Sequence, residues 1–250
     1  MTSYSPNDKL SRYVNVKRQF LVFRICFLTF SSLLLLACTP QTATISTTME
    51  KSLCFLALGD SYTIGEGVDS AQSWPYQLTE SLRNQDFNID DPLIIARTGW
   101  TTHDLLSAIE KADPQGSFDL VTLLIGVNNQ YQGRDIETYR LEFRTLLEMA
   151  IDFAGGNPAK VEVLSIPDWG VTPFAQDREH AKISTQIDQF NVVNLEESQA
   201  AGISYFDITP ISRQAANDTS LLASDGLHPS GKMYAAWVDL ILSQVIENLK

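Results

Sequence analysis

Leu53-Cys54-Phe55-Leu56-Ala57-Leu58-Gly59-Asp60-Ser61-Tyr62 is the stretch that decides the fold. Its six leading apolar residues are too few to cross a membrane and are typical of a strand buried on both faces, at the centre of a parallel sheet. Gly59, Asp60 and Ser61 then end the strand in a turn. Ligands of open α/β sheets bind just beyond the carboxyl ends of the strands. Ser61 is therefore a candidate nucleophile.

The rest of the chain alternates apolar runs with segments of helical spacing. Further strands are expected at 93–96, 120–125, 161–166 and 205–208, the fourth of the five strands being less buried because it holds Glu162 and Ser165. Helices are expected at 74–85, from Thr101 or Thr102 to 112, and at 136–154, 177–201 and 231–249. This order predicts a three-layer α/β/α sandwich around a five-stranded parallel sheet. Right-handed crossovers would place the loops after the first three strands along one rim, which collects Ser61, Gly99 and Asn128.

Charge and composition narrow the function classes. The 250 residues are 44% hydrophobic and carry a formal charge of −12. The first 37 residues hold five of the 18 basic and one of the 30 acidic residues, so the remainder has 13 basic and 29 acidic residues, a charge of −16. Such a chain can bury one sizeable core, and its field repels a phosphate backbone. We expect one domain over residues 52–250 and no nucleic-acid partner.

Residues 1–37 have the features of a secretory leader. Lys17 and Arg18 precede an apolar run whose uninterrupted part, 25–37, is 13 residues long, shorter than the roughly 20 that a membrane helix needs. The run ends in Leu35-Leu36-Ala37-Cys38, which resembles the lipobox of bacterial lipoproteins. That resemblance implies that Cys38 is lipidated and tethers the protein to a membrane of the bacterial envelope. Thr39 is compatible with outer-membrane sorting in a Gram-negative host.

Two alternatives stay open for this leader: an ordinary cleaved signal peptide, or an uncleaved anchor that tolerates Arg24. Residues 38–51, rich in Thr and Ser, are expected to form a flexible tether. Of the three cysteines, Cys26 would leave with the leader and Cys38 would carry lipid. Cys54 lies in a buried strand, where a thiol is usually inert. No pair remains for a disulfide.

A serine hydroxyl needs a base, and the base needs a carboxylate to hold its tautomer. Asp225 and His228 stand three residues apart just ahead of the last helix, a spacing at which two side chains can meet. His103 lacks a carboxylate at a matching spacing, and the charged neighbours of His180 favour a solvated surface. The chain has no His-x-x-x-His and no Cys-x-x-Cys pattern, so neither a metal nor another cofactor is expected.

Attack on a carbonyl creates an oxyanion, and each donor aimed at it typically contributes a factor of roughly 10²–10³. Three candidate donors lie on separate rim loops: the N–H groups of Ser61 and Gly99 and the side-chain amide of Asn128. Glycine lets the backbone approach a ligand closely. Simpler alternatives are that Gly99 only caps a strand and that Asn128 or Asn129 satisfies a turn.

Four short blocks follow one another along the chain: Gly59-Asp60-Ser61, Gly99, Gly126-Val127-Asn128 and Asp225-Gly226-Leu227-His228. In this order they resemble the blocks of the GDSL or SGNH hydrolase family. The resemblance spans residues 53 to about 245. It implies a flavodoxin-like sheet and a serine esterase with Ser61 as nucleophile, His228 as base and Asp225 as orienter. It also implies an oxyanion hole of Ser61, Gly99 and Asn128. The family often has Gly-x-Asn-Asp, whereas Asn129 replaces that Asp here, which puts the support of this loop in question.

The substrate stays open, since members of this family hydrolyse lipids, thioesters, aryl esters and sugar acetates. Trp100, Trp169 and Phe174 are candidates for the wall of an acyl or sugar pocket, or simply for packing the loops that carry them. The lack of a bulky lid favours short-chain esters, and an enzyme tethered in the envelope could act on acetyl groups of polysaccharides. The alternative function is a catalytically silent, envelope-tethered module that binds carbohydrate or lipid on the same fold.

Overall fold

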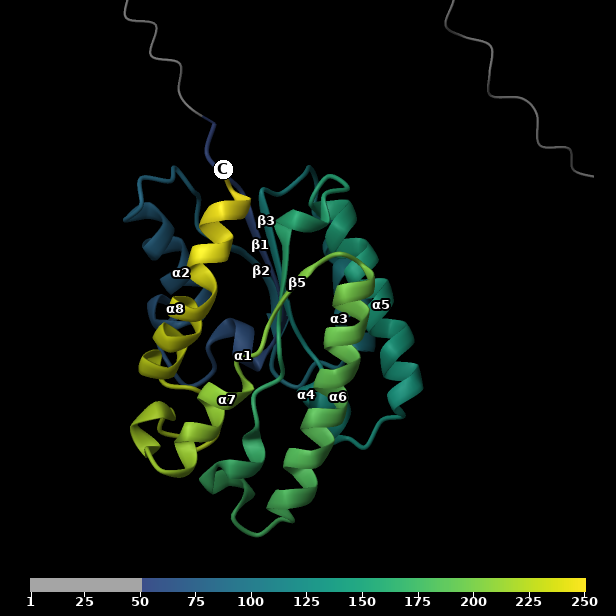
Figure 1. Cartoon of the computed structure of the whole chain (residues 1–250), viewed down its shortest axis with the longest axis vertical. Helices are drawn as coiled ribbons and strands as arrows, with labels where there is room; N and C mark the ends of the chain where they lie inside the picture. Colours follow the sequence, from purple (N-terminus) through teal and green to yellow (C-terminus); the bar gives the residue numbers. More distant parts are fainter. Residues whose placement is uncertain (1–50) are drawn as a thin grey trace, which may run out of the picture. The chain divides into compact units, whose positions relative to one another are not determined.

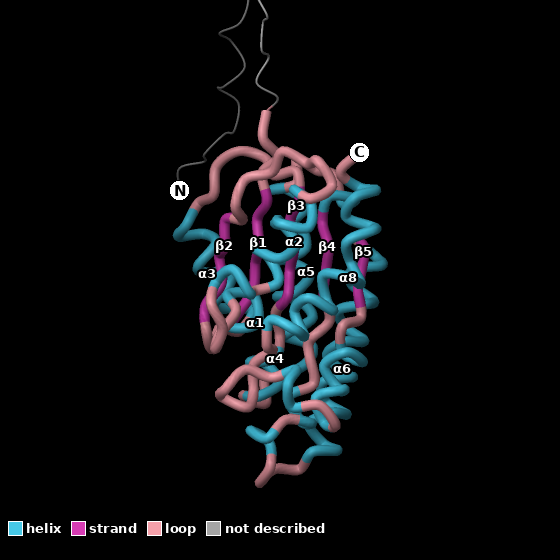
Figure 2. The backbone as a smooth tube through the Cα atoms, turned by 90° about the vertical axis from the view of Figure 1, so that its left-hand side faces the viewer, coloured by secondary structure: helices cyan, strands magenta, loops and turns pink. Residues whose placement is uncertain are grey.

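The computed structural model describes residues 51–250. These residues form a five-stranded, all-parallel sheet in the order β2-β1-β3-β4-β5 (Figure 2). The strands are β1 (Phe55–Asp60), β2 (Leu93–Arg97), β3 (Leu120–Leu124), β4 (Val161–Leu164) and β5 (Ser204–Phe206). The predicted leader, Cys38 and the tether up to residue 50 lie outside the described residues, and their boundaries stay predictions.

Two layers of long helices cover the sheet (Figure 1). α2 (Trp74–Arg83) and α8 (Gly231–Asn248) lie on one face, and α3 (Thr102–Ala112), α5 (Ile136–Phe153) and α6 (His180–Ala200) lie on the other. Three short helices, α1 (Ser61–Ile64), α4 (Val127–Tyr131) and α7 (Thr209–Ser212), stand beyond the carboxyl ends of the strands. Single 3₁₀ turns complete the described chain: η1 (Ser70–Gln72), η2 (Pro158–Lys160), η3 (Trp169–Val171), η4 (Pro173–Ala175), η5 (Arg213–Ala216) and η6 (Thr219–Leu221). The predicted three-layer sandwich is confirmed.

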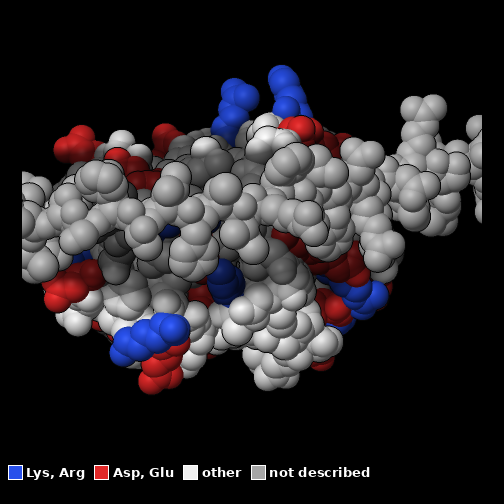
Figure 3. All heavy atoms as spheres, turned by 90° about the horizontal axis from the view of Figure 1, so that it is seen from above, with Lys and Arg blue, Asp and Glu red and all other residues white. Residues whose placement is uncertain are grey.

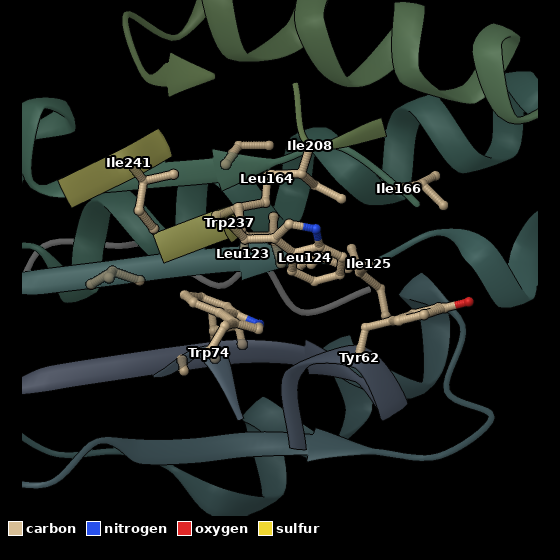
Figure 4. Packing of buried hydrophobic residues seen from close by; sticks show 14 of the residues in the cluster. Tyr62, Trp74, Leu123, Leu124, Ile125, Leu164, Ile166, Ile208, Trp237 and Ile241 are labelled. Carbon is tan, nitrogen blue, oxygen red and sulfur yellow. The ribbon is translucent and has the colours of Figure 1, made fainter. Parts of the chain in front are cut away.

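The core lies on both faces of the central strands. Every residue of β1 and of β3 is buried, as the unbroken apolar runs predict. The indole rings of Trp74 from α2 and Trp237 from α8 are fully buried in the apolar core (Figure 4). A tryptophan removes a large apolar area from water. These two rings therefore help to fix the helices against the sheet.

The register brings the site-bearing loops to one rim. Gly59 pairs with Ala96 of β2 and with Leu124 of β3, so these three strands end at the same level. The C-terminus lies at the opposite end of the domain (Figure 1). That end, seen in Figure 3, has acidic and basic side chains interspersed on its visible part. None of the helices within residues 51–250 is long and apolar enough to cross a membrane.

Two sequence expectations are wrong in detail. β4 is buried along its whole length, because its polar groups find partners inside the protein: the Glu162 carboxylate accepts a hydrogen bond from Asn248 Nδ2 at 2.7 Å. Ser165, just beyond the strand, donates to Asp207 Oδ1 at 3.0 Å. α6 begins at His180 rather than at residue 177, because the N–H of Arg178 still bonds to Ala175 in the preceding turn.

Candidate active site

Ser61 is the first residue of α1 and follows directly after β1. It is buried, with 5% of its surface exposed. Asp60 caps the helix, since its Oδ1 accepts a hydrogen bond from the Tyr62 N–H at 3.0 Å. A Cβ atom at Gly59 would collide with the Thr63 side chain and with the Leu124 carbonyl oxygen. Glycine at 59 thus lets the chain turn sharply from strand to helix, which presents Ser61 at the rim.

Asp60, the residue before Ser61, has a buried carboxyl group. Its carboxyl group is fully buried, and Oδ2 has no hydrogen-bond partner among the described residues. Burial raises its pKa to about 7, against the opposing effect of the Tyr62 N–H. The carboxyl group beside the turn that carries Ser61 is therefore largely neutral at mildly acidic pH.

Asp225 and His228 meet as their spacing predicts. Asp225 Oδ2 lies 2.6 Å from His228 Nδ1, while Oδ1 accepts hydrogen bonds from the N–H groups of Leu227 at 2.9 Å and His228 at 3.0 Å. Partial burial alone would raise the pKa of Asp225, but these hydrogen bonds outweigh it and hold the pKa below its ordinary value. An ionised carboxylate can only accept, so His228 Nδ1 carries the proton and Nε2 is left as the acceptor.

Packing holds the imidazole in place. His228 is 7% exposed, and the ring of Tyr62 lies against it with centroids 5.3 Å apart. The loop before it is closed by a hydrogen bond from the Ala223 N–H to the His228 carbonyl at 2.7 Å. Gly226 adopts a φ of 66°, a left-handed conformation that suits glycine in this turn. These contacts hold the loop at the point where it presents the ring.

Gly99 and Asn128 lie on neighbouring rim loops that are hydrogen-bonded to each other. Gly99 has a φ of 85°, and a Cβ there would meet nothing within 4 Å, so conformation rather than crowding favours glycine. Asn128 Nδ2 donates to the Trp100 carbonyl oxygen at 2.9 Å. One amide hydrogen of Asn128 is used in this way, and the other stays available to a ligand.

One cavity of about 230 Å³ joins the predicted residues. Ser61, Gly99, Asn128 and His228 all line it, and Asp225 stands behind His228. Within the described residues, no hydrogen bond joins the Ser61 hydroxyl to the imidazole. The other lining residues are Tyr62, Thr98, Val127, Tyr131, Trp169, Phe174 and Leu227.

The remaining histidines lie away from this cavity. The His103 side chain is 75% exposed, and its Nδ1 is 3.7 Å from Glu142 Oε1. His180 is exposed, and its Nδ1 lies 2.5 Å from the Gly170 carbonyl oxygen at the start of α6. Within residues 51–250, no group of three or more His, Cys, Asp or Glu side chains is placed to hold a metal ion.

The apolar wall of the cavity is only partly as expected. Trp169 and Phe174 line it, whereas Trp100 does not. Tyr131 completes the wall, with its ring 5.4 Å from that of Trp169. The sequence could have indicated it, because Tyr131 lies three residues after Asn128 and would share its helix face.

Arg178 covers the outer side of this aromatic wall. Its guanidinium carbon lies 5.1 Å from the ring centroid of Tyr131, 5.4 Å from that of Trp169 and 5.7 Å from that of Phe174. It also donates to the Tyr131 hydroxyl at 3.0 Å. No ion pair of the described chain includes Arg178. No local pattern in the sequence points to the whole contact, because Tyr131 lies on α4, far along the chain from Trp169, Phe174 and Arg178.

A family model matches the part of the chain that holds this cavity. The model of the GDSL-like lipase/acylhydrolase family matches residues 57–236. The match covers well over half of the chain and includes every residue that lines the cavity. No curated protein matches the chain.

Solved structures with the same fold are similar at low identity. TesA is 17% identical with a TM-score of 0.61, over 78% of this chain and 99% of that one. Esterase EstA from Pseudoalteromonas sp., in a structure inhibited by monoethylphosphonate, is 16% identical with a TM-score of 0.56, over 78% and 97% of the two chains. Axe2, an acetylxylan esterase from Geobacillus stearothermophilus, is 16% identical with a TM-score of 0.59, over 77% and 94%. At such identities the likeness concerns the fold.

Proposed function

Because the chain belongs to the GDSL-like lipase/acylhydrolase family, whose members are hydrolases of ester bonds, we propose that it cleaves carboxylic esters through a triad of Ser61, His228 and Asp225. One observation carries this proposal. Asp225 Oδ2 holds His228 Nδ1 at 2.6 Å, and His228 lines the same cavity as Ser61. The imidazole therefore has its second nitrogen free to act as the base for a hydroxyl that lines the same cavity.

The first half of the reaction makes an acyl-enzyme. His228 Nε2 takes the proton of the Ser61 hydroxyl while Oγ attacks the ester carbonyl carbon. Asp225 stays ionised and stabilises the imidazolium that forms. The tetrahedral intermediate then expels the alcohol, which takes the proton back from His228. The serine–imidazole hydrogen bond has to form in the substrate complex, and such bonds are often long in free enzymes.

The second half returns the enzyme to its starting state. His228 removes a proton from water, the hydroxide oxygen attacks the acyl carbon, and the serine oxygen leaves with the proton. In both halves the carbonyl oxygen becomes negative. The N–H groups of Ser61 and Gly99 and the free amide hydrogen of Asn128 are the donors for this charge. Ser61 N–H also stands at the first turn of α1, where helix N–H groups point outward.

The cavity favours a short acyl chain. Its volume of about 230 Å³ is below the roughly 300–1,000 Å³ that is typical of pockets for larger ligands. Val127, Tyr131, Trp169, Phe174 and Leu227 make one side of it apolar. An acetyl to butyryl group fits beside them, while a larger alcohol would extend into solvent. The fold likeness to an acetylxylan esterase makes acetylated sugars a reasonable substrate class to include in the test.

Hydrolysis of p-nitrophenyl acetate, butyrate and octanoate by the full chain tests this proposal. We expect Ser61→Ala to lower kcat by on the order of 10⁴–10⁶. Ser70→Ala is the matched control, because Ser70 is an exposed serine in the following loop. Equal rates for wild type and Ser61→Ala would refute the serine assignment, and absence of any hydrolysis across esters and acetylated sugars would favour the silent binding module.

The cellular placement is a separate proposal, supported by the Leu35-Leu36-Ala37-Cys38 sequence alone. We propose that Cys38 becomes the lipidated first residue of the mature protein and tethers it in the bacterial envelope. An alkyne-bearing palmitate fed to expressing cells should label the wild type and not Cys38→Ala. Equal labelling of the two proteins, or none of either, would contradict lipidation at this residue.

A further inference from the structure

Two buried polar residues connect the rim loops that carry Gly99 and Asn128. Asn129 is 2% exposed and Thr102, at the start of α3, is fully buried. Asn129 Oδ1 accepts from the Thr102 N–H at 3.0 Å, and Asn129 Nδ2 donates to Thr102 Oγ1 at 2.7 Å. Both contacts lie next to the bond between Asn128 and the Trp100 carbonyl. The two donor-bearing loops are therefore joined side by side.

The direction of these hydrogen bonds is fixed by the backbone. The Thr102 N–H can only donate, so the oxygen of the Asn129 amide must face it, and the NH₂ group must face the hydroxyl. Thr102 Oγ1 therefore accepts from Asn129 and has to donate its own hydrogen elsewhere. It donates to Glu142 Oε2 of α5. The chain of bonds runs from Asn129 through Thr102 to Glu142.

Glu142 is placed to serve as the end of this chain. Its side chain is 23% exposed, and its other oxygen, Oε1, faces His103 Nδ1 at 3.7 Å. One oxygen thus meets the buried hydroxyl while the carboxylate keeps some contact with solvent. An Asp at 129 would accept from Thr102 and end the chain there. With Asn at 129, the Thr102 hydroxyl accepts from residue 129 instead of donating to it. The negatively charged acceptor is then Glu142, on the other side of Thr102.

We propose that Glu142 is a positioning residue which, through Thr102 and Asn129, sets the spacing between Gly99 and Asn128. The inference rests on the proposed function, because these two residues are the oxyanion donors of that mechanism. Donors fixed in advance are effective only if they are aimed at the developing charge. A shift of about 1 Å in such a group can cost about 10²-fold in rate.

Reversing the direction of the chain tests this inference. Asn129→Asp alone leaves two carboxylates facing one hydroxyl hydrogen, and we expect kcat to fall about 100-fold with KM changed less than about threefold. Glu142→Gln alone keeps a neutral acceptor, and we expect a loss of about threefold. In the double variant, the new glutamine can donate to Thr102 Oγ1, and the hydroxyl can then donate to the new aspartate. We expect its kcat to return to within about fivefold of wild type.

Glu148→Gln is the matched control, since Glu148 is an exposed glutamate on the same helix. Melting temperatures of all variants separate lost positioning from lost folding. A folded Asn129→Asp with wild-type kcat, or a folded double variant no faster than Asn129→Asp, would overturn the inference. If Asn129→Asp does not fold, Glu142→Leu takes its place: a kcat about tenfold lower supports the inference, and an unchanged kcat overturns it. Ser61→Ala in the same assay shows whether the proposed function itself holds.

Discussion

Asp225→Asn should disable the enzyme while leaving its fold intact. The backbone N–H groups of Leu227 and His228 both point at Asp225 Oδ1, at 2.9 and 3.0 Å. An asparagine therefore keeps its oxygen on them and turns its NH₂ group toward His228 Nδ1. A nitrogen that faces a donor must be the acceptor, so the proton moves to Nε2. The imidazole is then held in the tautomer that cannot take the Ser61 proton.

The expected loss is about 10³- to 10⁴-fold in kcat, which is about 4 to 5.5 kcal/mol of transition-state stabilisation. The assay is p-nitrophenyl acetate hydrolysis at pH 7.5, with the melting temperature measured in parallel. Because the turn keeps its hydrogen bonds, the melting temperature should stay within about 2 °C of wild type. Asp225→Ala should lose activity and also melt earlier, because it removes those bonds as well. A folded Asp225→Asn with more than a tenth of the wild-type kcat would refute this reasoning.

Two further predictions concern stability and specificity. Burial raises the pKa of Glu162 to about 7 from an ordinary value of 4.5. Between these two pH values the folded chain holds a proton on Glu162 that the unfolded chain releases. The free energy of unfolding therefore falls as the pH rises from about 4.5 through 7. Urea titrations of Glu162→Gln at several pH values should show this fall reduced by up to about 3 kcal/mol. The remaining fall is due to Asp60, whose pKa is also raised. The same pH dependence of the unfolding free energy in wild type and Glu162→Gln would contradict this prediction. Arg178→Gln should raise KM for the butyrate ester about two- to fivefold and leave the acetate ester nearly unchanged, since the aromatic wall contacts the longer chain; equal effects on both esters would argue against that wall.

The parts of this fold that follow from local patterns could be predicted. β1 and β3 are unbroken apolar runs, and Thr101 caps α3 with a hydrogen bond to the Asp104 N–H, as its residue type favours. The Asp225–His228 contact follows from a spacing of three residues within one loop. Ser61, Gly99 and Asn128 share a cavity because parallel strands end at one rim, which is a consequence of topology.

The parts that depend on distant partners could not be predicted. Glu162 suggests a less buried strand, and only the fold shows that Asn248 of the last helix donates a hydrogen bond to it. Glu142 has no motif around it, and its role depends on a hydroxyl 40 residues earlier in the chain. The sequence does show that Asn129 departs from the family pattern. What supports this loop in place of an Asp depends on the direction of three hydrogen bonds, which only the fold supplies.

Covalent labelling of the nucleophile tests the central claim most directly. The full chain is treated with a p-nitrophenyl alkylphosphonate, which reacts with an activated serine as an ester does, and its peptides are weighed by mass spectrometry. We predict one phosphonyl group on the peptide that contains Ser61, no label there in Ser61→Ala, and much slower labelling in His228→Ala. A label on another residue, or inactivation of His228→Ala at the wild-type rate, would contradict the account.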